Sequence, residues 1–192
     1  MDFDALVTWA EIDLEAIRYN VRAFHRHVGG NVEVMAVVKA NAYGHGAVPV
    51  AKAALEAGAT RLGVHRLNEG IELRQAGIDV PILIMGYTPP AGAGEVVQWQ
   101  LTPSLITHEF AQALSTQAAA QGQVVPMHVK VDTGMSRYGL FPQEVLPFLQ
   151  SLQRLEGVKI EGLFTHFATA DSLDQTWVLK QIEVFDQVRA EV

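Results

Sequence analysis

A lysine stands where a predicted buried strand gives way to a polar loop. The apolar run 34–38 is followed at once by Lys39, and the loop 41–46 then carries Asn, Tyr, Gly and His side chains. In α/β folds, sites are built at the carboxyl ends of strands. A lysine there is partly desolvated, which lowers the pKa of its amine and favours Schiff-base formation. The alternative is a surface lysine that extends from a strand end into solvent.

A second group of charged residues surrounds the end of a later apolar run, 127–131. Asp132 follows this run directly, and Arg137 comes after a Thr-Gly turn. A planar guanidinium suits paired acceptors such as a carboxylate, although an arginine so placed is usually part of a surface salt bridge. Lys130 lies inside the run, where an uncompensated ammonium would be costly, so an ordinary lysine here needs a nearby carboxylate.

His166 follows the apolar run 160–164. A lone histidine at a strand end is more often a hydrogen-bonded core residue than a catalyst.

Two other short motifs lack the surroundings that their chemistry requires. Gly92-Ala93-Gly94 does not directly follow a predicted strand, as the glycines of a dinucleotide-binding motif do. His108-Glu109 lacks the second histidine that a zinc-binding helix would carry. No metal site is therefore predicted.

Six short apolar runs, alternating with amphipathic stretches, must position these residues. Nearly continuous apolar character is typical of parallel strands covered on both faces, and the runs are 34–38, 62–64, 82–85, 101–106, 127–131 and 160–164. The stretches between them predict helices over 14–28 after the cap Asp13, 47–57, 68–76, 108–121, from Pro142, and from about 171 or 172 to the chain end. The apolar face of the first helix is predicted as Leu14, Ile17, Val21, Phe24 and Val28.

This βα repeat predicts the α/β class with a parallel sheet. Pattern alone leaves two architectures open, an open doubly wound sheet and a (β/α)₈ barrel. A complete barrel takes ~250 residues, or roughly 30 per unit, so a barrel of this length would hold about six units. The segment 6–12 also reads as a strand, and because it precedes the first predicted helix it would pair outside the barrel.

Composition excludes several classes of function. The chain has 192 residues, of which 49% are hydrophobic and 18% charged, and its formal net charge is -7 without a basic cluster, which argues against nucleic-acid binding. The lack of cysteine excludes disulfides, thiolate metal sites and thiol catalysis. The acidic N-terminus lacks the features of a secretory signal, and no apolar stretch approaches the ~20 residues that span a bilayer. These features predict a soluble, cytoplasmic protein.

The string AVVKANAYGHG, residues 36–46, resembles the pyridoxal-phosphate attachment site of alanine racemases. The resemblance implies that Lys39 forms a Schiff base with pyridoxal 5'-phosphate and then serves as one of two catalytic bases. It also implies that Tyr43 contacts the cofactor phosphate, and His45 is expected to support the loop. The cofactor would act as the electron sink for a Cα carbanion, while the protein positions the base.

The string HVKVDTGMSRYG, residues 128–139, resembles the same family. It implies that Arg137 lies near the cofactor ring oxygen and the substrate carboxylate. It also implies that the backbone of Met135 lines the substrate pocket. In many family members the residue matching Lys130 is carbamylated, and such an anion would hold the arginine; the alternative is an ordinary, paired lysine.

The string THFATAD, residues 165–171, completes the resemblance. It implies that His166 belongs to a polar relay beneath the cofactor. The chain departs from the family at His65-Arg66, where small or apolar residues are common, and at Asn68, where an acidic residue is common. These departures follow the second strand and could alter the polarity of the barrel mouth.

Taken over the whole chain, the resemblance favours the barrel, present as about six of eight units. Residues 1–12 would pair with a C-terminal β-domain and residues 13–192 would form an incomplete cofactor-binding barrel. The implied reaction interconverts L- and D-alanine for cell-wall precursors, in a homodimer. The phosphate loops and the second base, a tyrosine of the partner subunit, lie outside this sequence, so the chain alone is expected to be inactive. A serine or broad-specificity racemase and a non-catalytic pyridoxal-phosphate barrel are the alternatives.

Overall fold

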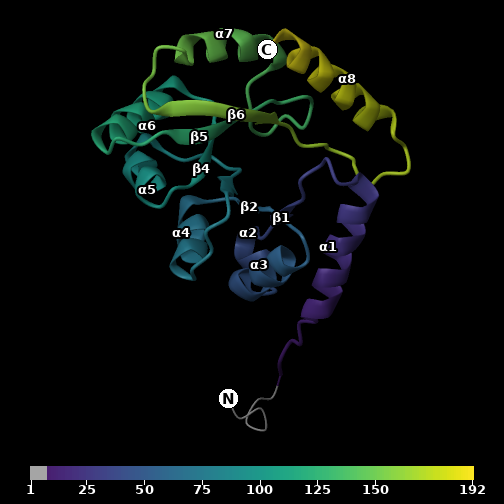
Figure 1. The fold of residues 1–192 in the computed structure, drawn as a ribbon. Coiled ribbons are helices and arrows are strands. Elements are labelled where there is room, and N and C mark those ends of the chain that lie inside the picture. The colour runs from purple at the N-terminus through teal and green to yellow at the C-terminus, as the bar shows by residue number, and fades with distance from the viewer. Residues whose placement is uncertain (1–7) are drawn as a thin grey trace.

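The computed structural model describes residues 8–192 and shows one curved sheet with helices outside it (Figure 1). The strands are β1 (Met35–Val37), β2 (Arg61–Val64), β3 (Ile82–Ile84), β4 (Thr102–Leu105), β5 (Val125–Lys130) and β6 (Val158–Phe164). The helical segments are α1 (Leu14–Val28), α2 (Lys39–Tyr43), α3 (Ala47–Glu56), α4 (Leu67–Gln75), η2 (Pro90–Gly92), α5 (Ala93–Gln98), α6 (His108–Ala120), α7 (Pro142–Leu152) and α8 (Thr176–Glu191). The chain is therefore of the predicted α/β class.

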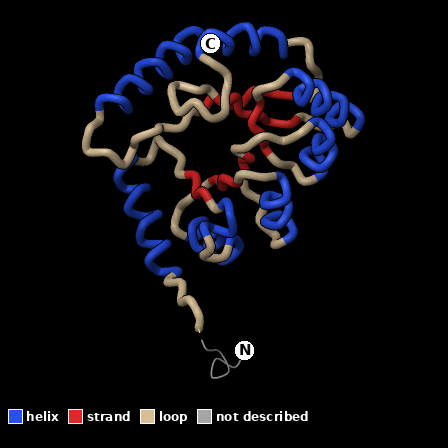
Figure 2. Tube along the Cα trace, turned by 180° about the vertical axis from the view of Figure 1, so that it is seen from behind, coloured by secondary structure: helices blue, strands red, loops and turns tan. Residues whose placement is uncertain are grey.

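The strands are all parallel and lie in the order β1-β2-β3-β4-β5-β6, so each strand pairs with its neighbours in sequence. Figure 2 shows them curving around a central space with the helices on the outside, which is the arrangement of a barrel and not of an open doubly wound sheet. Within residues 8–192 no pairing joins β1 to β6. The barrel is open at these two edges.

The apolar core lies between the sheet and its helices, and it is densest at the middle strands. Every residue of β3 and β4 is buried, whereas β1 is half-buried and the residues of β6 are either half-buried or exposed. A strand flanked on both sides and covered on both faces loses its contact with water, and an edge strand does not. The largest fully buried side chains include Phe110, Leu62, Leu73, Ile82, Ile84, Leu101, Leu105, Leu114 and Met127.

A network of ion pairs joins β2 to β5 and β6. Arg61 of β2 lies 2.7 Å from Glu33 and 3.0 Å from Glu161 of β6, measured between guanidinium nitrogens and carboxylate oxygens. Nε2 of His128, on β5, lies 3.0 Å from the same Glu161 carboxylate. Three strands that are not all neighbours are thus connected through one carboxylate.

The sequence placed helix α1 correctly, but only part of its predicted apolar face is covered. Oδ1 of Asp13 accepts hydrogen bonds from the Glu15 and Ala16 N–H groups, which begins the helix as predicted. Leu14 and Ile17 pack against the core, but the Phe24 side chain is 65% exposed. The prediction was wrong for Phe24, and also for Val28, which is 38% exposed, because α1 lies beside the uncovered edge of the sheet, where no further strand of the described chain adjoins β1.

Three other expectations differ from the structure. Helix α8 begins at Thr176 rather than at 171 or 172, and the Asp174 carboxylate, just before it, accepts the Thr176 N–H at 2.9 Å. Helices α2 and α5 had not been predicted. Of the predicted strand 6–12, residues 6 and 7 lie outside the described part, and residues 8–12 are not in a strand here; pairing with a β-domain stays a prediction. Among residues 8–192 no helix is long and apolar enough to cross a membrane.

Candidate functional site

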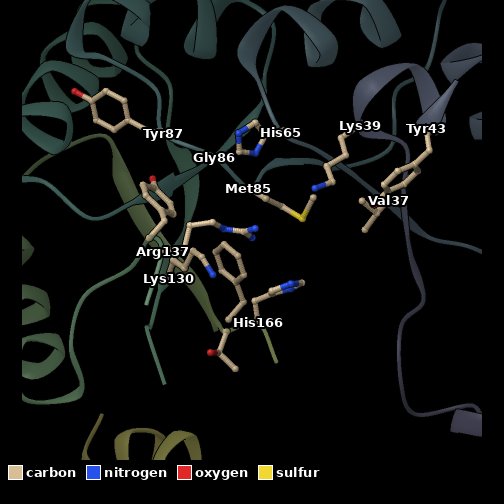
Figure 3. Close-up of a pocket in the computed structure, with 13 residues that line it drawn as sticks. Val37, Lys39, Tyr43, His65, Met85, Gly86, Tyr87, Lys130, Arg137 and His166 are labelled. Atoms are coloured by element: carbon tan, nitrogen blue, oxygen red, sulfur yellow. The ribbon is translucent and has the colours of Figure 1, made fainter. Parts of the chain in front are cut away.

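A cavity of about 420 Å³ opens at the carboxyl ends of the strands (Figure 3). The structure brings together five of the six predicted site residues there, since Lys39, Tyr43, Lys130, Arg137 and His166 all line it. Met135 does not contribute to the lining. The remaining lining residues are Val37, His65, Met85, Gly86, Tyr87, Tyr138, Phe164 and Thr165.

Lys39 enters the cavity from a left-handed turn. The four residues from Ala40 to Tyr43 have φ between 51° and 55°, a conformation that non-glycine residues adopt rarely and at an energetic cost. Gly44 ends the turn at φ 90°, where its N–H bonds the Ala40 and Asn41 carbonyls. The Lys39 Nζ lies 5.8 Å from the centroid of the Tyr43 ring, so both residues face the same side of the cavity.

Side chains hold this turn at its beginning and its end. The Glu69 carboxylate accepts the Ala40 N–H at 2.6 Å, and the Asn41 side-chain oxygen accepts the Ala47 N–H at 2.7 Å. The His45 ring contacts the Ala42 carbonyl at 2.9 Å, consistent with the supporting role expected of it. Strained backbone persists where the surrounding structure fixes it, and here the fixed segment is the one that carries the lysine.

The loop after β5 forms the opposite wall. Oδ1 of Asp132 accepts the N–H groups of Gly134 and Ser136, each at 2.9 Å, which curls the chain back toward the cavity. Gly139 closes the loop at φ 141°, and a Cβ there would lie only 2.8 Å from the Asp132 nitrogen. This tight loop presents Arg137 to the cavity, opposite Lys39 (Figure 3).

Lys130 is buried beside Arg137. Its side chain ends 5.0 Å from the centroid of the Phe164 ring, and the residue is only 6% exposed. Burial lowers the pKa of the Lys130 amine, and the neighbouring Arg137 cation lowers it further, against a smaller opposing effect of Asp132. The neutral, nucleophilic form of this amine is therefore more accessible than in an ordinary lysine.

His166 faces the same cations, and its loop is held by a buried glutamine. Partial desolvation lowers the pKa of His166, and the positive charges of Lys130, Arg137 and Lys39 add to this effect. Gln181 of α8 is fully buried, donates to the His166 carbonyl and the Thr133 hydroxyl at 3.2 Å, and accepts the Ala168 N–H at 2.9 Å. One side chain thus joins the loops after β5 and β6.

Three polar aromatic residues on the cavity wall were not predicted as site residues. His65 follows β2, Tyr87 comes shortly after β3, and Tyr138 adjoins Arg137. Burial raises the pKa of Tyr138, and Tyr87 adds to this, so its hydroxyl remains protonated. Within residues 8–192 that hydroxyl has no hydrogen-bond partner. The rule that strand ends share one edge could have identified His65 and Tyr87 from sequence.

The donor set fits an anionic, partly aromatic carbonyl compound. Lys39 supplies a primary amine, Lys130 and Arg137 supply further positive charge, and the apolar side chains of Val37, Met85 and Phe164 offer contact to a ring. The Tyr138 hydroxyl is buried and has no hydrogen-bond partner among the described residues. Pyridoxal phosphate has these chemical properties: an aldehyde, a phosphate and a flat ring. Among residues 8–192 no group of three or more His, Asp or Glu side chains could hold a metal ion.

Comparison with known proteins gives one consistent result. Residues 12–192 match the family described as "Alanine racemase, N-terminal domain". The chain is 49% identical over 178 residues to the alanine racemase of Desulforamulus reducens, covering 92% of this chain and 48% of that protein. It is 47% identical to that of Symbiobacterium thermophilum, covering 100% of this chain and 51% of that one. The chain spans about half the length of the curated relatives it matches.

Solved structures agree with this comparison. The alanine racemase of Clostridium difficile 630, in complex with cycloserine, superposes with a TM-score of 0.92 at 38% identity, over 97% of this chain and 52% of that one. A histidine racemase from Leuconostoc mesenteroides superposes with a TM-score of 0.83 at 31% identity, over 90% of this chain and 46% of that one. The open barrel therefore has the fold of the N-terminal TIM-barrel domain of these racemases.

Proposed function

The chain belongs to the alanine racemase N-terminal domain family, and we propose that the natural protein containing it interconverts L- and D-alanine with pyridoxal 5'-phosphate. The observation that carries this proposal is the convergence of the Lys39 amine with Lys130, Arg137 and His166 on one cavity. We further propose a cytoplasmic homodimer that supplies D-alanine for cell-wall precursors.

Each residue of the cavity would contact a different part of the cofactor. Lys39 would hold it covalently through the aldehyde carbon, Tyr43 would contact its phosphate, and Arg137 would contact its ring oxygen and the substrate carboxylate. His166 would belong to the polar relay beneath the ring, and the Met135 backbone would approach the substrate. When bound, the cofactor withdraws electrons from the amino-acid Cα and stabilises the carbanion left by proton removal.

Racemisation requires a proton to leave one face of Cα and another to arrive at the opposite face. Lys39 Nζ would take or return the proton on one face, as a general base or acid. The second group would be a tyrosine of the partner subunit. The chain spans about half the length of its relatives, so we expect residues 1–192 alone to be inactive.

We also propose that Lys130 is carbamylated. Its neutral Nζ would attack the carbon of carbon dioxide, forming an N–C bond and releasing a proton. The product is an anion next to Arg137, where the unmodified side chain is a buried cation beside another cation. The lowered pKa of Lys130 and its burial beside Arg137 support this proposal.

A racemase of broader substrate range is the second candidate. The observation that favours it is the His65 imidazole on the cavity wall, since a group of this kind can hydrogen-bond a polar substrate side chain (Figure 3). The likeness to a histidine racemase adds to it. Steady-state rates with L-alanine, L-serine and L-histidine decide between the two candidates, since alanine racemase should prefer alanine by at least about tenfold in kcat/KM.

The cofactor proposal has a direct test. The natural protein is incubated with pyridoxal phosphate, reduced with borohydride, digested and mapped by mass spectrometry. The label should be found on Lys39. A label on another lysine, or none, would remove the proposed cofactor site.

A further inference from the structure

Glu69, on the first turn of α4, contacts two separate parts of the cavity rim. One carboxylate oxygen accepts the N–H groups of His65 at 2.7 Å and Arg66 at 2.9 Å. The other accepts the N–H of Ala40 at 2.6 Å, 29 positions earlier in the chain. The first two bonds are those of an ordinary helix N-terminus; the third is not explained by capping α4.

The bond to Ala40 acts on the peptide unit that follows the Lys39 Cα. This unit is planar, so fixing its N–H also fixes its carbonyl, and with it the ψ angle of Lys39. On the other side of the lysine, the Val38 N–H bonds the Gly63 carbonyl of β2 at 2.8 Å. Lys39 is therefore bracketed by two backbone contacts, and both partners belong to the β2–α4 segment.

The conformation of the turn is a further reason why the hydrogen bond from Ala40 to Glu69 matters. Ala40 is the first of four non-glycine residues with positive φ, a run that the local sequence does not favour. Partial burial would raise the pKa of Glu69, but the bonds from Ala40, Arg66 and His65 together lower it below its usual value, so the group is an anion at neutral pH. An ionised acceptor makes stronger hydrogen bonds than a neutral one.

We propose that Glu69 is a positioning residue for Lys39: its carboxylate fixes the beginning of the left-handed turn and so sets the direction in which the lysine amine enters the cavity. This inference rests on the proposed function, because it concerns the lysine assigned to the cofactor. Glu69 does not line the cavity, so its effect passes through the backbone of Ala40.

The test compares Glu69→Gln with Glu72→Gln in the natural protein. An amide of the same shape has one acceptor oxygen, so it cannot serve Ala40 on one side and His65 and Arg66 on the other. Glu72 is an exposed residue of the same helix and is the matched control. Two quantities are measured: hydrogen exchange of the Ala40 amide, and the rate at which pyridoxal phosphate becomes attached to Lys39 and trapped by borohydride.

We expect Glu69→Gln to speed exchange of the Ala40 amide about ten- to hundredfold and to slow attachment at Lys39 by about tenfold or more. Glu72→Gln should change neither. Thermal unfolding of both variants shows whether the fold is retained, and Glu69→Asp, which keeps the charge but shortens the reach, should also slow attachment.

Faster exchange with an unchanged attachment rate would overturn the proposal, because Glu69 would then merely cap α4. Unchanged exchange would overturn it as well. If the wild-type protein itself shows no label on Lys39, the proposed function fails. If it is labelled and Glu69→Gln is labelled equally fast, only the role of Glu69 fails.

Discussion

Two lysines line the same cavity from opposite walls, and their surroundings differ in almost every respect (Figure 3). Lys39 is half-buried and follows the short edge strand β1 in a left-handed turn. Lys130 ends β5, is 6% exposed, and lies over the Phe164 ring beside Arg137. Backbone geometry determines where Lys39 points, whereas burial determines the charge that Lys130 can carry.

The difference shows how one residue type can serve two chemistries at one site. An amine that must form and release a covalent bond needs access and a fixed direction. An amine that must remain next to a guanidinium without repelling it needs its charge removed or reversed. Each wall of the cavity supplies one of these conditions and not the other.

The largest effect should come from removing the accessible amine. Lys39→Ala should abolish borohydride-stable labelling by pyridoxal phosphate and lower racemisation of alanine by at least about 10²–10⁴-fold, since one positioned base is lost. Chiral chromatography of the products measures the rate. Lys52→Ala, at an exposed position on α3, is the control and should keep both properties. Substantial labelling of the Lys39→Ala protein would place the covalent site elsewhere.

A smaller loss should follow from removing the buried amine. Lys130→Ala should lower activity about 10- to 100-fold while leaving labelling of Lys39 in place, because the residue acts through Arg137 and makes no covalent bond. If Lys130 is carbamylated, added acetate should partly restore activity by supplying the missing carboxylate. Lys159→Ala, exposed on β6, should need no rescue. A ¹³C NMR spectrum of the folded wild-type protein in ¹³C-bicarbonate that shows no carbamate resonance would contradict the carbamate.

Stability should depend on pH through Lys130. In buffer free of carbon dioxide, the folded protein binds the Lys130 proton less tightly than the unfolded chain, whose lysine has the ordinary pKa of 10.5. The unfolding free energy should therefore rise as pH rises through the window between the lowered folded pKa and 10.5, and be reduced below it. Urea denaturation across this range measures the slope, which Lys130→Met should flatten. An equal slope in both proteins would show that Lys130 is not the group responsible.

The smallest expected effect is a change in the pKa of His166 when either lysine is replaced. The positive charges of Lys130 and, to a smaller extent, Lys39 lower the pKa of His166. In buffer free of carbon dioxide, where Lys130 is unmodified, Lys130→Met should therefore raise that pKa more than Lys39→Met does. Titration of the His166 ring resonances by NMR gives both shifts. A larger response to Lys39→Met would mean that the half-buried Lys39, and not the buried Lys130, dominates the electrostatic potential at His166.

The positions of the charged residues could be predicted from the sequence, because a single rule of parallel sheets applies to all of them. The carboxyl ends of parallel strands lie along one edge, so residues after β1, β5 and β6 had to converge. This rule located Lys39, Lys130, Arg137 and His166 at one mouth. If the rule had been applied to every strand end, and not only to those with a recognised motif, it would also have identified His65 and Tyr87, which follow β2 and β3.

Other features could not be read from the sequence. Nothing in Ala40, Asn41 and Ala42 indicates a left-handed turn, since alanine favours right-handed helix; the conformation depends on a carboxylate on α4, 29 positions after Ala40. The exposure of Phe24 likewise depends on what adjoins the edge of the sheet, and not on the periodicity of α1. Local pattern predicts elements, but contacts between distant segments decide these details.

The carboxylate shared by Arg61 and His128 also bears on the order in which the chain folds. All strand pairs join neighbours in sequence, so the sheet can grow one strand at a time with short loops to close. The Arg61–Glu161 pair joins residues 100 positions apart and can form only once that growth has bent the sheet around. Contacts that form after the transition state retard unfolding and leave the folding rate unchanged. This ion pair should therefore act on the lifetime of the curved sheet, and not on how fast it forms.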